Sequence, residues 1–178
     1  RLTSIYNTAR NVTSQLNRIL ANYDKSLRPR VFGGGPTQVF IDINVRTMGL
    51  ISEKTDTYSF DCYFRQTWQD DRLRFSSHSS SLRVLSLSTA MLDRIWKPDV
   101  YFWNDAGSYV HKQTVPNRLV RLSEDGTVLF SMRLTIKAKC RMHLKRYPLD
   151  KQACRLVIGS FAYPKDDMTL KWKVRVSA

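Results

Sequence analysis

Residues 128–139 read Val-Leu-Phe-Ser-Met-Arg-Leu-Thr-Ile-Lys-Ala-Lys, a stretch in which every second side chain is apolar. Successive side chains of a strand point to opposite faces, so this period predicts a β-strand with one face toward a core and the other toward solvent or a partner. The same period recurs in residues 41–46, 58–65 and 170–176. Strands therefore dominate the predicted fold.

The segments before and between these strands complete the predicted architecture. Asp125-Gly126 is typical of a tight hairpin, because such a turn needs a residue that adopts positive φ. Near the N-terminus, apolar residues recur every three or four positions, which predicts an amphipathic helix. We predict a mainly β chain, an antiparallel β-sandwich of immunoglobulin-like form with one N-terminal α-helix. Its predicted parts are the helix over 1–26, a Gly/Pro linker over 27–37 and the sandwich over 38–178.

The charge of the chain raises the question of an acidic partner. The 178 residues carry a formal net charge of +14, which first suggests a nucleic acid or another polyanion. The basic residues are spread along the chain and mostly alternate with apolar ones, as on the solvated faces of strands. We therefore predict no nucleic-acid partner and keep a basic polyanion-binding module as an alternative. No apolar run reaches the ~18–20 residues of a membrane span, so any anchor is expected outside these residues.

Signatures of catalysis and of metal binding are absent from the sequence. The three histidines, His78, His111 and His143, do not have the spacing of zinc ligands. The sequence contains no nucleophile elbow, no phosphate-binding glycine loop and no Cys-x-x-Cys motif. We predict that the protein is not an enzyme and that it holds no metal and no cofactor.

The cysteines carry information about the compartment. Cys140 and Cys154 enclose a short loop and fit either a disulfide, which is typical of an extracytosolic protein, or two free buried thiols. Cys62 lies on the apolar side of its predicted strand, which favours a buried, inert thiol. Asn11-Val12-Thr13 is an acceptor sequence for N-glycosylation and agrees with an extracytosolic location.

Several of these residues resemble the signature of one receptor family. The two cysteines with Tyr147-Pro148-Leu149-Asp150 between them, and the run Trp96-Lys97-Pro98-Asp99, resemble motifs of the Cys-loop family of pentameric ligand-gated ion channels. Phe64-Arg65-Gln66-Thr67-Trp68 is similar to a strand of alpha-type subunits of γ-aminobutyric acid (GABA) type A receptors. The chain as a whole resembles the alpha-like subunits of invertebrates. The resemblance runs from the leading helix to about Trp172. It implies the Cys140–Cys154 disulfide and a chain truncated before the capping hairpin and the transmembrane helices of the family.

The resemblance also implies an agonist site between the principal face of one subunit and the complementary face of its neighbour. The residues that match the complementary face are Tyr63, Arg65, Arg121 and Ser131. The strand period places Tyr63, Arg65 and Ser131 on outward faces. An arginine suits a ligand carboxylate through charge-assisted hydrogen bonds, and Tyr63 offers an aromatic contact.

The principal face and the coupling loop are predicted from the same resemblance. Tyr101, Phe161 and Tyr163 match aromatic positions of the principal face, where an aromatic cage holds an ammonium group. Gly159 stands where beta-type subunits carry a glutamate, and Trp103 where drug-sensitive alpha subunits carry a histidine. Tyr147, Pro148 and Asp150 match the loop that meets the membrane domain in the family. Lys145, Arg146 and Asp150 are expected to pair with charges of that domain. The alternative is that Pro148 and Asp150 only determine the shape of the loop.

These expectations define a function and its alternatives. We expect the extracellular neurotransmitter-binding region of a GABA-gated chloride channel subunit at the synaptic cell surface, in a homo- or hetero-pentamer with a beta-type neighbour. One alternative is a subunit of the same family gated by glutamate, histamine or another amine. Another is a soluble secreted binding protein of this fold.

Overall fold

The structure is a computed structural model that describes residues 14, 16–75 and 83–174. The predicted glycosylation site at Asn11 and the histidine at position 78 lie outside these residues. Residues 14 and 16–21 are helical, and turns occupy much of the segment from there to residue 36. Two further short helical segments are η1 (Asp71–Leu73) and α2 (Thr89–Leu92).

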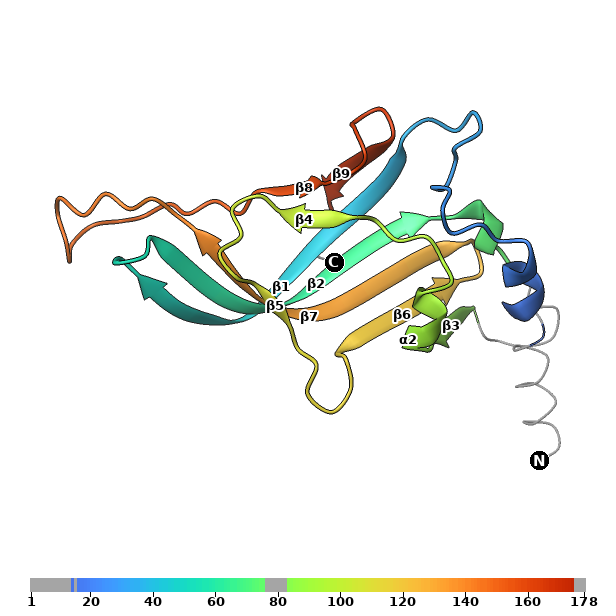
Figure 1. Ribbon diagram of the computed structural model, residues 1–178, viewed down its shortest axis with the longest axis horizontal. Helices are drawn as coiled ribbons and strands as arrows, with labels where there is room; N and C mark the ends of the chain where they lie inside the picture. The colour runs from blue at the N-terminus through green and yellow to red at the C-terminus, as the bar shows by residue number, and fades with distance from the viewer. Residues whose placement is uncertain (1–13, 15, 76–82, 175–178) are drawn as a thin grey trace.

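In the described part of the chain, the strands form one seven-stranded sheet and one two-stranded sheet. The spatial order of the large sheet is β3 (Val84–Leu87), β6 (Arg118–Ser123), β7 (Thr127–Lys139), β2 (Thr57–Gln69), β1 (Thr37–Ser52) and β9 (Met168–Trp172), and β5 (Tyr109–Val110) also pairs with β7. The small sheet contains β4 (Val100–Phe102) and β8 (Ile158–Ser160). The N-terminal helix lies at one end of the elongated large sheet, and the β1–β2 hairpin and the β7–β8 loop reach the opposite end (Figure 1).

The prediction of a mainly β sandwich is confirmed, with one difference in strand direction. Every other pairing in the described sheets is antiparallel, but β9 runs parallel to β1, from Thr37 opposite Met168 to Ile41 opposite Trp172. The chain leaves β8 in the small sheet and enters the large sheet at the edge of β1. There the Thr37 amide donates a hydrogen bond to the Asp167 carbonyl oxygen (2.8 Å). The large sheet is therefore mixed, because the direction of a strand follows from this crossover and not from its own side-chain pattern.

The two sheets enclose the core that the alternation predicts. Cys62, Phe64 and Ile136 are buried on the inner face of β2 and β7, and Phe102 of β4 packs edge-on against Phe64 with ring centroids 5.4 Å apart. The predicted inner face of the last strand differs, since Trp172 is 61% exposed. The alternation thus identifies the buried side of the central strands and fails at the edge strand β9.

The predicted hairpin connects β6 to β7. Gly126 has φ +85°, and a Cβ atom at this position would lie 2.5 Å from the Asp70 carbonyl oxygen. Both the turn geometry and this close approach require glycine.

The buried carboxylate of Asp70 connects the N-terminal segment to the sandwich through hydrogen bonds. Asp70 is fully buried and accepts hydrogen bonds from the Tyr23 hydroxyl (2.7 Å) and from Arg72 Nε (2.9 Å). The Tyr23 hydroxyl in turn accepts a hydrogen bond from the Trp96 amide (3.1 Å). Burial and the neighbouring Asp70 carboxylate raise the pKa of Tyr23, so the phenol stays protonated and keeps donating.

Cys62 is the free cysteine of the described residues, and its side chain is completely buried. Burial, with a smaller contribution from the Asp61 carboxylate, raises the pKa of the Cys62 thiol to about 11. At pH 8 only about one such thiol in a thousand is ionised, and the thiolate is the nucleophile. We expect no labelling of Cys62 by a thiol-specific reagent in the folded chain and full labelling in denaturant, as measured by mass spectrometry. Rapid labelling of the folded chain would contradict the buried position.

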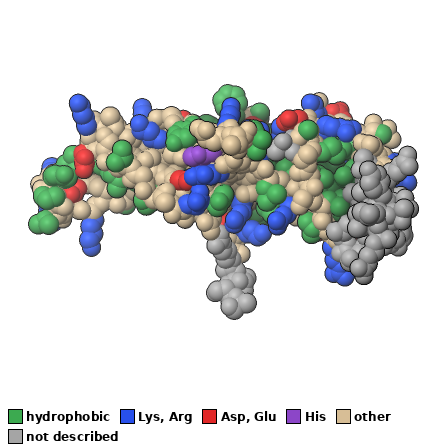
Figure 2. Space-filling model, turned by 90° about the horizontal axis from the view of Figure 1, so that it is seen from below, with side chains coloured by type: hydrophobic (Ala, Val, Ile, Leu, Met, Phe, Trp, Pro, Cys, Tyr) green, Lys and Arg blue, Asp and Glu red, His purple; other side chains and the backbone are tan. Residues whose placement is uncertain are grey.

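No helix in the described residues is long and apolar enough to cross a membrane. On the face seen in Figure 2, Lys and Arg side chains gather near the middle with few Asp and Glu side chains between them. This distribution agrees with the net charge of +14.

Candidate functional site

The register of four strands places the predicted complementary-face residues next to one another. Arg65 of β2 lies between Asp42 of β1 and Ser131 of β7, and Ser131 pairs on its other side with Leu119 of β6. These residues form one row across the outer face of the large sheet. Ser131 is only 9% exposed, because its larger cross-strand neighbours flank it.

An open groove of about 680 Å³ runs over this row. All four residues predicted for the complementary face, Tyr63, Arg65, Arg121 and Ser131, line it. Residues predicted from segments far apart in the sequence are thus brought together on one surface. The groove is also lined by Asp42, Arg118 and Lys173.

The arginines at the groove differ in their partners. Arg65 Nη1 lies 3.1 Å from Asp42 Oδ2, and Arg133 binds Asp61 through Nη2 (2.7 Å) and Nε (3.2 Å). This pairing lowers the pKa of Asp61, so the pair stays charged in neutral solution. The Arg121 side chain has no ion pair or hydrogen bond with another described residue. Arg121 can therefore offer its guanidinium donors to a carboxylate from outside the chain.

Tyr63 forms one wall of the groove beside the arginines. Its ring lies under two guanidinium groups, with the Arg46 carbon 5.4 Å and the Arg65 carbon 5.9 Å from the ring centroid. Cation–π attraction holds the ring and the Arg65 side chain together. The ring is still 37% exposed, which leaves aromatic surface for a ligand.

The predicted principal-face residues divide into two places. The Tyr101 ring packs against Phe161, with centroids 5.7 Å apart, and against Trp103, with centroids 6.0 Å apart. Tyr163 instead packs against Trp96, and its hydroxyl accepts a hydrogen bond from Trp96 Nε1 (3.0 Å). The structure therefore joins Tyr101 and Phe161 with Trp103 and places Tyr163, half-buried, against the core.

The Trp96-Lys97-Pro98-Asp99 motif holds the segment that carries these aromatic residues. Asp99 accepts hydrogen bonds from the Ser160 hydroxyl (2.7 Å) and from the Ala162 amide, on either side of Phe161. A carboxylate that accepts both bonds fixes the turn at this point. The motif thus determines where Phe161 is presented.

Trp103 occupies the space beside Gly159. A Cβ atom at position 159 would lie 3.1 Å from Trp103 Nε1 and 3.2 Å from Trp103 Cδ1. A side chain at position 159 would require the indole ring, which is 70% exposed, to shift by a few tenths of an ångström. The aromatic cluster of Tyr101, Trp103 and Phe161 therefore contains no carboxylate from position 159.

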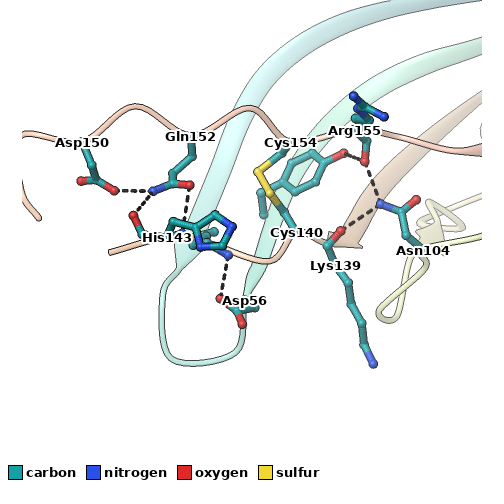
Figure 3. Close-up of a disulfide and its surroundings, with 11 residues drawn as sticks. Asp56, Asn104, Lys139, Cys140, His143, Asp150, Gln152, Cys154 and Arg155 are labelled. Carbon is teal, nitrogen blue, oxygen red and sulfur yellow. Dashed lines mark hydrogen bonds between the residues drawn. A yellow bond between two sulfur atoms is a disulfide. The ribbon is translucent and has the colours of Figure 1, made fainter. Parts of the chain in front are cut away.

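Cys140 and Cys154 form a disulfide between the end of β7 and the segment before β8. Gln152 bridges the two arms of the enclosed loop, since its Nε2 donates to the His143 carbonyl oxygen (3.1 Å) and its Oε1 accepts from the His143 amide (3.3 Å) (Figure 3). Gln152 Nε2 also donates to Asp150. At the tip, Tyr147 and Leu149 are 62% and 90% exposed. The pairing of the cysteines is confirmed, and the predicted coupling residues lie on an anchored loop with an exposed apolar tip.

Comparison with known proteins identifies the family. Residues 12–177 match the model of the neurotransmitter-gated ion-channel ligand binding domain. The chain belongs to this family. It is a family of receptors and not of enzymes, as the absence of catalytic motifs predicts.

The similar curated proteins are GABA receptor subunits. The chain is 49% identical over 166 residues to the "Gamma-aminobutyric acid receptor alpha-like" of Drosophila melanogaster, with 93% of the chain and 24% of that protein covered. It is 44% identical to the alpha-6 subunit of Gallus gallus (92% of the chain, 34% of that protein) and 41% identical to the alpha-2 subunit of Bos taurus (93% and 36%). The chain thus spans about a quarter to a third of the length of these relatives.

Two residues at the candidate site and the disulfide loop, Asp42 and Asn104, have no clear sequence signal. Asp42 alternates with apolar residues like any solvated strand residue, and only the register of β1 against β2 reveals its ion pair with Arg65. Asn104 donates to the carbonyl oxygens of Lys139 (2.9 Å) and Arg155 (2.7 Å) and so clamps the base of the disulfide loop (Figure 3). These contacts join segments far apart in the chain, which a local pattern does not record.

Proposed function

We propose that this chain is the extracellular agonist-binding part of a GABA-gated chloride channel subunit. In this proposal it lies on the outer side of the plasma membrane at synapses, in a pentamer with a beta-type neighbour. The groove of Tyr63, Arg65, Arg121 and Ser131 receives the carboxylate of GABA as the complementary face of the site. The observation that carries the proposal is that these four side chains line one groove, in which the Arg121 guanidinium has no partner among the described residues.

The chemistry of the groove suits one end of a zwitterionic amino acid. The guanidinium groups of Arg65 and Arg121 are donors for a carboxylate, and the Ser131 hydroxyl can add a neutral hydrogen bond. The described lining contains no carboxylate that is unpaired and ready for an ammonium group, since Asp42 already pairs with Arg65. The amine of the ligand must therefore be bound by the neighbouring subunit.

The aromatic cluster supports this division of the ligand. Tyr101, Trp103 and Phe161 offer ring surfaces, but Gly159 supplies no anionic partner for an amine and its space is taken by Trp103. We infer that this chain acts through its complementary face toward GABA and that its neighbour supplies the principal face.

The end of the molecule opposite the N-terminal helix supports a role in coupling agonist binding to the pore. The β1–β2 hairpin carries Met48 and Leu50, which are 62% and 86% exposed, and the disulfide loop presents Leu149 at the same end of the sheet (Figure 1). Exposed apolar side chains in such number mark a contact with another part of a protein or with a membrane. In the proposed receptor this contact transmits agonist binding to the pore.

The full-length subunit, co-expressed with a beta-type partner in oocytes, tests the proposal. GABA is expected to elicit a current whose reversal potential follows chloride. Arg121→Ala is expected to raise the half-maximal GABA concentration tenfold or more, or about 1.4 kcal/mol, because the change removes a carboxylate donor and leaves no partner unpaired. The matched control is Lys137→Ala, which removes one exposed positive charge from β7 outside the groove. Equal responses of both variants to GABA would contradict the proposed site.

A further inference from the structure

A carboxylate lies inside the groove that is expected to bind a carboxylate. Asp42 lines the groove, its side chain is only 15% exposed, and its Oδ2 is 3.1 Å from Nη1 of Arg65. The cross-strand register of β1 and β2 places the two residues directly opposite each other, so the pair is built into the sheet. The ligand thus meets an arginine that is already engaged on one side.

The pair has two consequences for a ligand. First, Asp42 holds the guanidinium in one orientation, with Tyr63 beneath it, which lowers the entropy that Arg65 loses on binding. Second, Asp42 cancels the charge of Arg65, so the basic lining residues without an ion pair in the described part of the chain are Arg118, Arg121 and Lys173. Arg133 is likewise compensated by Asp61, and Lys173 is exposed to screening by solvent.

We propose that Asp42 is a specificity-determining residue that restricts the groove to ligands with one carboxylate. This inference rests on the proposed function and adds the ligand class that the site rejects. A ligand with two carboxylates carries a second negative charge, which the Asp42 carboxylate repels across the groove. A ligand with one carboxylate is attracted by the uncompensated basic residues and avoids this additional repulsion.

GABA and glutamate form a matched pair of probes, because glutamate is GABA with one additional carboxylate on the carbon that carries the amine. The full-length subunit is co-expressed with a beta-type partner, and two concentrations are measured. One is the GABA concentration that gives half-maximal current. The other is the glutamate concentration that gives half-maximal current or, if glutamate does not open the channel, the glutamate concentration that halves the response to GABA. Their ratio is the readout, because a general defect in folding or gating moves both ligands together.

Two substitutions of Asp42 are made, Asp42→Asn and the smaller Asp42→Ser. If one variant does not assemble, the other can still be measured. The matched control is Asp71→Asn, which removes a carboxylate that pairs with an arginine, Arg74 (2.7 Å), away from the groove. Surface labelling confirms that each variant reaches the membrane.

The expected result is that the preference for GABA over glutamate falls at least tenfold in the Asp42 variants and less than threefold in Asp71→Asn. An unchanged preference, or an equal fall in all three variants, would overturn the assignment of specificity to Asp42. A wild-type receptor without a GABA current would instead contradict the proposed function, and the inference would fall with it.

Discussion

Replacing Asp70 with alanine is expected to lower the free energy of unfolding by about 3 kcal/mol or more, because it removes the central acceptor of a buried charged network. The Asp70 carboxylate accepts from the Tyr23 hydroxyl at 2.7 Å and from Arg72 Nη2 at 2.9 Å. Without it, the Tyr23 hydroxyl loses the acceptor of its proton and Arg72 Nε loses its partner, and unsatisfied polar groups that are shielded from water carry a desolvation cost. The N-terminal helix, which is followed directly by Tyr23, would detach first.

Asp71→Ala is the matched control for this variant. Asp71 adjoins Asp70 in the sequence, but its side chain is 47% exposed and forms surface ion pairs with Arg74 (2.7 Å) and Arg30 (3.8 Å). Exposed pairs contribute about 1 kcal/mol or less, so the control is expected to stay within that limit. Urea unfolding followed by tryptophan fluorescence measures both variants. Similar unfolding midpoints for the two would show that the Asp70 network does not stabilise the fold.

The second large effect is expected for Trp96→Ala, at about 3–5 kcal/mol. Trp96 is 3% exposed and packs edge-on against Trp68, with ring centroids 5.9 Å apart. Its Nε1 also donates to the Tyr163 hydroxyl at 3.0 Å, so truncation opens a cavity and leaves this hydroxyl without its donor. Because Asp99 of the same motif fixes the turn around Phe161, loosening at Trp96 is expected to disorder that turn as well.

Trp103→Ala provides the comparison for this large side chain. Trp103 lies seven positions further along the chain and is 70% exposed, so its truncation removes little buried surface. The loss is expected to stay near 1 kcal/mol or below, since surface substitutions away from special features have small effects. Comparable destabilisation by both alanine variants, measured by the same urea titration, would contradict the assignment of Trp96 to the core.

The parts of the fold that the sequence predicts are those set by local periodicity. The alternation in residues 58–65 identifies Phe60, Cys62 and Phe64 as buried and Tyr63 and Arg65 as facing outward, and the structure confirms this division. Asp125-Gly126 predicts its hairpin because the tight turn needs a residue that adopts positive φ, which is a local requirement. The identity of the family follows equally from short motifs with fixed spacing.

The parts that the sequence does not predict depend on contacts between distant segments. The parallel pairing of β9 with β1 results from a crossover between sheets, which leaves no trace in the pattern of either strand. Tyr163 matches an aromatic position of a ligand pocket by resemblance, but its partner Trp96 lies 67 positions earlier and holds it, half-buried, against the core. The Asp42–Arg65 pair needs the register of two strands, which depends on the packing of the whole face.

Equilibrium binding of GABA to membranes that carry the full-length subunit and its beta-type partner tests the central claim most directly, because binding separates the site from channel opening. The variants are Arg65→Ala in the groove and Lys137→Ala as the matched loss of one positive charge on the same sheet face. We predict that Arg65→Ala raises the dissociation constant tenfold or more, about 1.4 kcal/mol of binding free energy, and that Lys137→Ala leaves it within threefold. An unchanged dissociation constant in Arg65→Ala would place the agonist elsewhere and contradict the complementary-face site.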